Sequence, residues 1–276
     1  MSPTALLALQ AEPSSYLSLG TGQLALAAAL IVVNGGVSVA LRLGMERELA
    51  LASVRSVVQL ALVGLVLEWV FDLRDLPVVL LLCLAMVVAA TVAAARRPAR
   101  TYRGIYRDSF VAMAVSSLLV TLVAVAGILS VDPWWEPQYL IPLLGMLLGN
   151  SLTGISLGLD RLLTRVRDAR DEIEARLALG ATTWEASLPA VRESVRTGMI
   201  PIVNTMMVVG IVSLPGMMTG QILAGADPVD AVRYQILILF MIAACTALGT
   251  LGAVLLGYRR LFDEGARLRP ERIRRR

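Results

Sequence analysis

The sequence predicts an all-α, polytopic bundle of transmembrane helices, for three reasons. Hydrophobic residues make up 57% of the 276 residues, and charged residues only 17%. The mean hydropathy is +0.73, so the chain has far more apolar surface than one soluble core of this length buries. Seven stretches are apolar over the length of about 20 residues that a helix needs to cross the bilayer core. We therefore expect the surplus apolar surface to face lipid.

The predicted spans follow one another as a single transmembrane domain over residues 1–276. They cover residues 23–41, 53–71, 76–95, 109–131, 139–159, 197–218 and 232–257. Ahead of them, the first twenty residues have no positively charged start, and Glu12 and Pro13 interrupt their apolar stretch, so we expect no cleaved signal peptide. An odd number of spans places the two termini on opposite sides of the membrane.

The arginines predict the orientation of these spans. Since the sequence has no lysine, all 25 cationic side chains are arginines. They gather after the first, third and fifth spans and in the tail, residues 259–276, whereas the opposite face receives only Arg74 and Arg233. By the positive-inside rule the N-terminus is outside and the C-terminus is cytoplasmic. We interpret the basic tail as a topology signal attracted to anionic lipid, and we expect no nucleic-acid partner.

Missing residue types exclude several classes of function. Without histidine the chain cannot form Ser-His or Cys-His catalytic pairs, or His-ligated zinc and haem sites. Without lysine it lacks the residue with which a P-loop reaches the β- and γ-phosphates of a nucleotide. Cys83 and Cys245 lie in separate apolar runs and predict neither a disulfide framework nor a CxxC metal site. We therefore expect no enzyme active site and no cofactor in this chain.

The longest polar segment, residues 160–196, is predicted to form a helical loop in the cytoplasm. Apolar residues recur at helical spacing in its first half, which gives one apolar stripe. Opposite charges stand four residues apart on the remaining surface, at Arg167/Asp171, Arg170/Glu174 and Glu172/Arg176. Gly180 can end this helix in the left-handed conformation, and Thr182 with Glu185 forms a capping-box pattern that starts a second helix.

Residues 174–181, Glu-Ala-Arg-Leu-Ala-Leu-Gly-Ala, resemble the EAA loop of ABC-transporter permeases. In that family the loop carries a short coupling helix that docks into a groove of the ATPase subunit. The resemblance implies that contact with an ATPase depends on Glu174, Ala175, Gly180, Ala181, Thr182 and Trp184. Residues 181–184 are the part expected to enter the groove.

Longer segments resemble the FetB-type permeases, a family with a bacterial iron exporter and plant permeases linked to aluminium tolerance. These segments are residues 141–151, 198–201, 206–210 and 213–223. The resemblance implies the permease subunit of an ABC transporter in the inner, cytoplasmic membrane, paired with a FetA-type ATPase that binds ATP and Mg. It also implies a metal ion such as iron as cargo, and export as the direction. Since ABC transporters need two membrane domains, we expect a permease homodimer.

Polar or helix-breaking residues at membrane depth mark a candidate translocation path, because lipid-facing surface does not need them. They are Asn34, Asn150, Ser151, Thr153, Asn204, Thr205, Pro215 and Gly216. The last two interrupt the sixth span, and broken helices tend to line cavities. Hydrogen bonding between helices is the alternative explanation for the polar side chains. Methionines near the path are either soft metal ligands or gap-filling apolar residues, so a metal site stays open.

The middle of the membrane lacks carboxylates, which proton-driven carriers usually retain. This favours an external ATPase as the energy source. Two alternatives stay open: an ion-coupled secondary transporter, and a non-transporting membrane scaffold.

Overall fold

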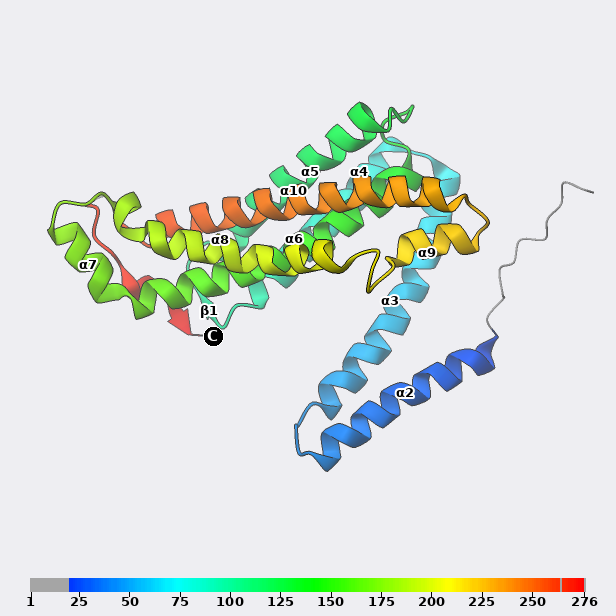
Figure 1. Ribbon diagram of the computed structural model, residues 1–276, viewed down its shortest axis with the longest axis horizontal. Coiled ribbons are helices and arrows are strands. Elements are labelled where there is room, and N and C mark those ends of the chain that lie inside the picture. The colour runs from blue at the N-terminus through cyan, green and yellow to red at the C-terminus, as the bar shows by residue number, and fades with distance from the viewer. Residues whose placement is uncertain (1–19, 264, 276) are drawn as a thin grey trace, which may run out of the picture. The chain divides into compact units, whose positions relative to one another are not determined.

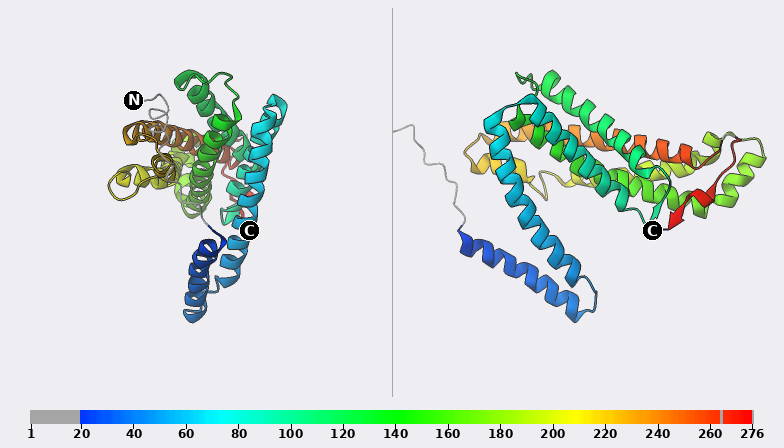
Figure 2. Two further views of the ribbon diagram at one scale, coloured as in Figure 1. Left: turned by 90° about the vertical axis from the view of Figure 1, so that its right-hand side faces the viewer. Right: turned by 180° about the vertical axis from the view of Figure 1, so that it is seen from behind.

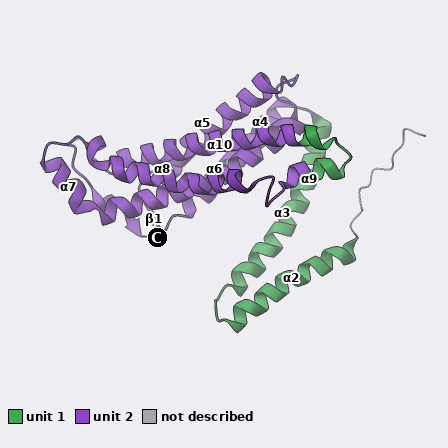
Figure 3. Cartoon of the chain, viewed as in Figure 1, with its two compact units in different colours: residues 1–73, 219–231 green, residues 74–218, 232–276 purple. Residues whose placement is uncertain are grey.

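The computed structural model describes residues 20–263 and 265–275, and helices dominate it (Figure 1). The chain divides into two compact units, which are described separately (Figure 3). Unit 1 takes in residues 1–73 and 219–231, and unit 2 takes in residues 74–218 and 232–276. The expectation that the first twenty residues are not a signal peptide falls mainly on residues 1–19, which lie outside the described residues.

Unit 1 contains a helical hairpin of α2 (Thr21–Ala40) and α3 (Glu46–Leu73). The buried Ser38 hydroxyl fastens the hairpin, because it donates to the Glu46 carboxylate over 3.0 Å and accepts the Met45 amide over 3.0 Å. Nearly all other side chains of the hairpin are exposed, and they are mainly apolar. Such a surface is stable only in a lipid-like surrounding or against another apolar surface.

Unit 2 is a helical bundle in which α6 is central. Its helices are α4 (Leu76–Arg96), α5 (Ile105–Leu122) with the π-helical turn η1 (Val123–Ile128), α6 (Pro137–Asp168), α7 (Arg170–Ala178), α8 (Thr183–Val208) and α10 (Pro228–Arg260), whose first turn belongs to unit 1. A further short helix, α9 (Gly216–Leu223), begins in unit 2 and ends in unit 1. α6 packs against α4, α5 and α8. Seen from behind, α4 and α5 cover the face of α6 opposite to α8 (Figure 2).

Small residues let α6, α8 and α10 approach closely. A Cβ atom on Gly198 of α8 would lie 2.6 Å from the Gly154 carbonyl oxygen of α6 and 2.5 Å from the Thr250 methyl carbon of α10. A Cβ atom on Gly158 would lie 2.8 Å from the same methyl carbon. The Gly154/Gly158 spacing is thus a helix contact, whereas Gly149 has no atom within 4 Å of such a Cβ position.

The same contacts fix the helix directions. Gly154 faces Thr250, and four residues later Gly158 faces Val254, so α6 and α10 run in the same direction. Gly154 also faces Gly198, whereas Gly158 faces the earlier residue Ser194, so α8 runs in the opposite direction to both. All three helices lie side by side along the length of unit 2 (Figures 1 and 2).

Six helices of the described residues are long and apolar enough to cross a membrane: α2, α3, α4, α5 continued by η1, α6 and α10. The prediction of a polytopic, all-α membrane protein is confirmed. The sixth predicted span, residues 197–218, is not among the six. α8 carries Arg192, Glu193 and Arg196 in its middle and ends at Val208. Gly210 then takes a positive φ of 82°, and the chain stays irregular until α9 begins at Gly216.

The described residues of the basic tail predicted over 259–276 are folded onto the arginine-rich end of unit 2. Its first residues complete α10, and η2 (Pro270–Arg272) leads into β2 (Arg274–Arg275), which pairs antiparallel with β1 (Arg100–Thr101). Arg260 donates two hydrogen bonds of 3.3 Å to the buried Asp108 carboxylate at the start of α5. This pair fastens the ends of α5 and α10 together, because an unpaired buried carboxylate is costly.

Candidate functional site

The loop between α6 and α8 has the predicted order of helix, glycine turn and helix, with one difference. The first helix is divided, since α6 ends at Asp168 and Ala169 leaves helical geometry before α7 begins. Two of the three predicted ion pairs are present, each at 2.8 Å: Arg170 with Glu174, and Arg176 with Glu172. Within the described residues the third predicted pair, Arg167 with Asp171, forms no ion pair. Its two residues flank the division between the helices.

The turn after α7 is closed by backbone hydrogen bonds. Gly180 has a φ of 91°, in the left-handed region that favours glycine. Its amide donates to the Leu177 carbonyl, and the Ala181 amide donates to the Arg176 carbonyl, both over 3.0 Å. These two bonds define a Schellman motif, which requires the left-handed residue at this position. The predicted turn at Gly180 is confirmed.

The second helix of the loop begins with the predicted capping box. The Thr182 hydroxyl accepts the Glu185 amide over 3.2 Å, and the Glu185 carboxylate accepts the Thr182 amide over 2.8 Å. The Glu185 carboxylate accepts from the Thr182 amide and also from the Thr182 hydroxyl over 2.8 Å, and these two bonds hold its pKa below the ordinary value. The short connection between α7 and α8 is therefore held at its start by the Schellman motif and at its end by the capping box.

An apolar tip projects from this turn. Leu179 is 88% exposed and Trp184 is 41% exposed, while Ala175 is also exposed. Trp184 packs edge-on against Tyr258 of α10, with 5.7 Å between ring centroids. Sequence reasoning missed Leu179, although its place outside the apolar stripe, one residue before the glycine, was a usable signal. Two large apolar side chains exposed at a turn whose backbone is fixed by hydrogen bonds form a candidate contact surface for another protein.

A charge network joins the loop to the helices beneath it. Glu193 of α8 accepts hydrogen bonds from Arg161 and lies 3.2 Å from Arg165, both of α6. Arg165 also lies 3.6 Å from Glu172 of α7, which pairs in turn with Arg176. The hydrogen bond from Arg161, and then the charges of both arginines, keep the pKa of Glu193 below its ordinary value, although burial opposes this. These ion pairs connect α7 to the C-terminal part of α6 and to the N-terminal half of α8.

The candidate path residues of α6 divide into two kinds. Ser151 is fully buried, and its hydroxyl lies 3.1 Å from the Cys245 sulfur of α10, so it serves helix packing. Asn150 is exposed, and its amide nitrogen donates over 2.9 Å to the Met146 carbonyl of its own helix. Thr153 is half-buried and bonds weakly, at 3.5 Å, to the Gly149 carbonyl. The alternative of interhelical hydrogen bonding therefore fits Ser151 alone among these three.

Asn204 and Thr205 are exposed on α8, where the Thr205 hydroxyl donates over 3.0 Å to the Pro201 carbonyl. Because Gly154 faces Gly198 and the helices are antiparallel, Asn150 and Asn204 lie within about one turn of the same depth. An amide exposed to hydrocarbon is costly, so both indicate a polar path or a protein partner. Asn34, on α2 in unit 1, is exposed as well.

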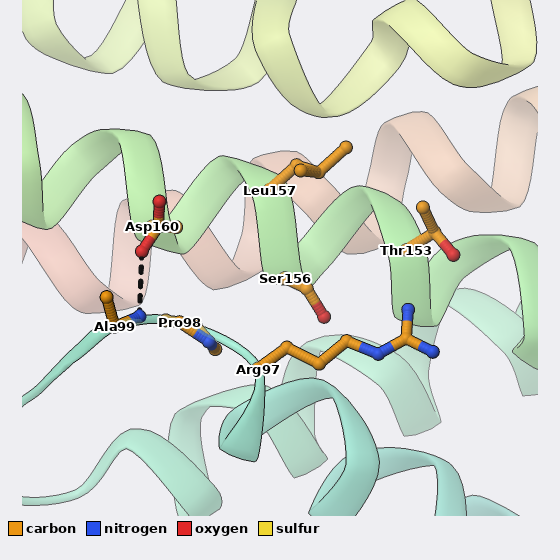
Figure 4. A pocket seen from close by; sticks show the side chains of 7 residues that line it. All are labelled: Arg97, Pro98, Ala99, Thr153, Ser156, Leu157 and Asp160. Carbon is orange, nitrogen blue, oxygen red and sulfur yellow. Dashed lines mark hydrogen bonds between the residues drawn. The ribbon is translucent and has the colours of Figure 1, made fainter. Parts of the chain in front are cut away.

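A cavity of about 250 Å³ lies between α6 and the turn after α4 (Figure 4). Its lining is formed by Arg97, Pro98, Ala99, Thr153, Ser156, Leu157 and Asp160. The Arg97 guanidinium extends along α6 toward Thr153, and the Asp160 carboxylate accepts the Ala99 amide over 2.9 Å (Figure 4). A predicted path residue, Thr153, thus lines a cavity at the arginine-rich end of the bundle, together with the charged side chains of Arg97 and Asp160.

A second cavity, of about 280 Å³, lies where α8 breaks. Pro215, Met218 and Gln235 are part of its mainly apolar lining. The Gln235 amide oxygen is buried without a hydrogen-bond partner in the described residues, and the sequence interpretation did not single it out. The irregular segment before α9 therefore lines a cavity, as broken membrane helices do. Gly216, which opens α9, is exposed.

Metal ligation was left open by the sequence. Among residues 20–263 and 265–275, no group of three or more His, Cys, Asp or Glu side chains is placed to hold a metal ion. Of the methionines near the path, Met218 lines the second cavity.

Comparisons with known proteins agree with the membrane fold. Residues 21–262 match a protein family that is described as 'Uncharacterised protein family (UPF0014)'. A UPF0014 membrane protein of Synechocystis is 38% identical over 226 residues, which cover 82% of this chain and 87% of that protein. The probable iron export permease protein FetB of Escherichia coli is 36% identical over 240 residues, 87% of this chain and 91% of FetB.

A plant relative shows the same degree of coverage. Protein ALUMINUM SENSITIVE 3 of Arabidopsis thaliana is 32% identical over 244 residues, 88% of both chains. No solved structure matches this chain. The predicted resemblance to FetB-type permeases is confirmed by these matches.

Proposed function

Since the chain belongs to the UPF0014 family of membrane proteins, we propose that it is the permease subunit of an ABC transporter with a separate ATPase subunit. The observation that carries this proposal is the loop between α6 and α8. It presents a rigid turn with the exposed Leu179 and Trp184, and it is joined by ion pairs to both helices. A loop that merely connected two helices would need neither an exposed apolar tip nor this bracing.

The proposal includes a seventh membrane crossing, made by α8. Because α6 and α10 run in the same direction, the chain between them has to return across the bundle. α8 runs opposite to both and supplies this return, although charged residues at its cytoplasmic end and its early break shorten its apolar part. Seven crossings place the N-terminus outside and the arginine-rich ends of α6 and α10 in the cytoplasm.

In this arrangement the coupling residues of the loop have separate tasks. Ala181, Trp184 and the exposed Leu179 contact the ATPase, and Ala175 lies on the accessible surface of α7. Gly180 and Thr182 fix the shape of the turn through the Schellman motif and the capping box. Glu174 holds α7 through its ion pair with Arg170. ATP and Mg bind to the ATPase partner, whose closure would move α7.

The proposed cargo is a metal ion such as iron, exported across the cytoplasmic membrane. This part of the proposal is supported by the printed name of the Escherichia coli relative, a probable iron export permease. The two separate cavities of unit 2, one at the arginine-rich end and one at the break of α8, are the proposed places of cargo contact.

The proposal is tested by isolating the tagged chain from membranes that also contain its ATPase and measuring the native mass of the complex. Two copies of the chain with two ATPase subunits are expected, because an ABC transporter needs two membrane domains and this chain supplies one. Recovery of the chain without any ATPase would refute the assignment and return it to the secondary-carrier or scaffold class.

Replacing Asn150 or Asn204 with leucine is expected to lower transport severalfold while the protein still folds and assembles. Neither amide bonds to another helix of the chain in the described residues, so its loss leaves the packing of unit 2 intact. Cargo-stimulated ATP hydrolysis and the yield of assembled complex are measured together. Ser151→Leu is the matched contrast: this buried position should lose folded protein through overpacking. Poor assembly of the asparagine variants would instead assign them to helix packing.

A further inference from the structure

The C-terminal segment, residues 261–263 and 265–275, lies against the proposed coupling loop. Phe262 packs edge-on against Tyr258 with ring centroids 5.8 Å apart, and Tyr258 packs in the same way against Trp184. Leu261 and Leu268 are buried. This row of aromatic rings connects the C-terminal segment directly to the helix that starts at the coupling turn.

Specific hydrogen bonds hold the segment in a defined shape. The Asp263 carboxylate accepts the Arg267 amide and the Arg269 guanidinium, both over 2.8 Å. The Arg272 guanidinium donates to the carbonyls of Arg260 and Phe262 over 2.8 and 2.9 Å. The guanidinium groups of Arg269 and Arg272 thus form hydrogen bonds within the C-terminal part of the chain. By contrast, the exposed Arg267 guanidinium makes no hydrogen bond or ion pair with any described residue, and only its charge acts on Asp263, where it helps the hydrogen bond from the Arg267 amide to keep the pKa of that carboxyl low.

Between the C-terminal segment and the coupling loop lies a groove of about 470 Å³. One wall is formed by Glu174, Leu177 and Ala181 of the loop, and the other by residues 265–269. The carboxylate in the first wall, Glu174, already pairs with Arg170. The groove therefore offers the Arg267 guanidinium, which forms no hydrogen bond or ion pair with a described residue, beside the apolar side chains of Leu177 and Ala181.

With α6 crossing the membrane as proposed, the groove lies beyond the lipid headgroups. α6 continues from Asp160, at the end of its predicted span, to Asp168, which extends about 12 Å at 1.5 Å per residue. The polar layer on each side of the hydrocarbon core is only about 5–7 Å thick. α7 follows α6 and lies at the outermost end of unit 2 (Figure 1). A soluble protein reaches this position more readily than a lipid headgroup does.

We propose that the C-terminal segment is the second wall of the ATPase docking surface, and that a carboxylate-bearing segment of the ATPase enters the groove and pairs with Arg267. This inference rests on the proposed function. The positive wall accepts an acidic partner, and the apolar side chains of the loop wall contact the rest of the entering segment.

The test compares Arg267→Glu with the wild-type chain in nanodiscs that hold the full-length protein, by titration with the purified ATPase. Charge reversal should weaken binding about five- to tenfold and reduce its dependence on salt, because it removes an attraction at the interface and adds a repulsion. The thermal stability should fall only slightly, because the Arg267 guanidinium makes no hydrogen bond or ion pair with a described residue and loses only its attraction to the Asp263 charge. Arg103→Glu, an exposed arginine outside the groove, is the matched control and should bind normally.

Wild-type affinity of Arg267→Glu would overturn the inference and leave the proposed function intact. Failure of the wild-type chain itself to bind the ATPase would refute the proposed function instead. A loss that disappears when anionic lipids are omitted from the nanodiscs would show that Arg267 contacts the membrane, and it would also overturn the inference.

Discussion

Replacing Gly180 with valine is expected to lower coupled transport about tenfold or more, while the transmembrane helices still insert. A β-branched residue at a φ of 91° costs about 1–3 kcal/mol, and a factor of ten corresponds to about 1.4 kcal/mol. A Cβ atom at this position would meet no other atom within 4 Å, so the cost lies in the backbone and not in crowding. The Schellman motif would open and misplace Leu179 and Ala181 relative to the ATPase.

The measurement pairs ATPase binding with transport in the same membranes. Gly180→Asn is the control, because asparagine tolerates the left-handed conformation and should keep most of the activity. If Gly180→Val binds the ATPase and transports like the wild type, the loop is not the coupling element.

Replacing Gly198 with alanine is expected to destabilise unit 2 strongly. The added Cβ atom would lie 2.6 Å from the Gly154 carbonyl oxygen, and this backbone atom can move only if α6 and α8 separate. Overpacking of this kind costs about 1–3 kcal/mol, which corresponds to a decrease in Tm of about 3–10 °C for a protein of this size.

Thermal unfolding of the purified chain measures this effect. Gly149→Ala on α6 is the matched control, because its Cβ atom would meet nothing within 4 Å and the Tm should hardly change. Equal Tm values for Gly198→Ala and the wild type would contradict the close packing of α6, α8 and α10.

Local signals in the sequence were sufficient for most of the fold. Apolar runs of membrane length identified the six helices that can span a bilayer, and the residues at Gly180, Thr182 and Glu185 predicted the turn and the cap. These features depend on neighbours within a few residues. The sixth predicted span did not match, because hydropathy over a window cannot show that α8 would stop at Val208 and that the chain would continue as an irregular segment.

The parts of the site that sequence reasoning missed depend on residues far apart in the chain. Glu193 joins α8 to Arg161, 32 positions earlier, and Arg260 reaches Asp108 across 152 positions. No spacing rule reveals such pairs. The polar residues of the candidate path were identified by type alone, so Ser151, which packs against Cys245, was grouped with the exposed Asn150.

These contacts suggest how the two ends of the proposed mechanism are joined. A force on α7 would pass through Glu172 and Arg165 to Glu193 at the base of α8. About three turns further along that helix lies Asn204. The coupling turn and the candidate path are thus connected through α8, which carries both Glu193 and Asn204.

The central claim is tested most directly by cargo movement in proteoliposomes that contain the purified chain with or without its ATPase. The account predicts transport only when the ATPase and hydrolysable ATP are both present, and none when an ion gradient is imposed on the chain alone. Transport by the chain alone, driven by an ion gradient and unaffected by ATP, would contradict it.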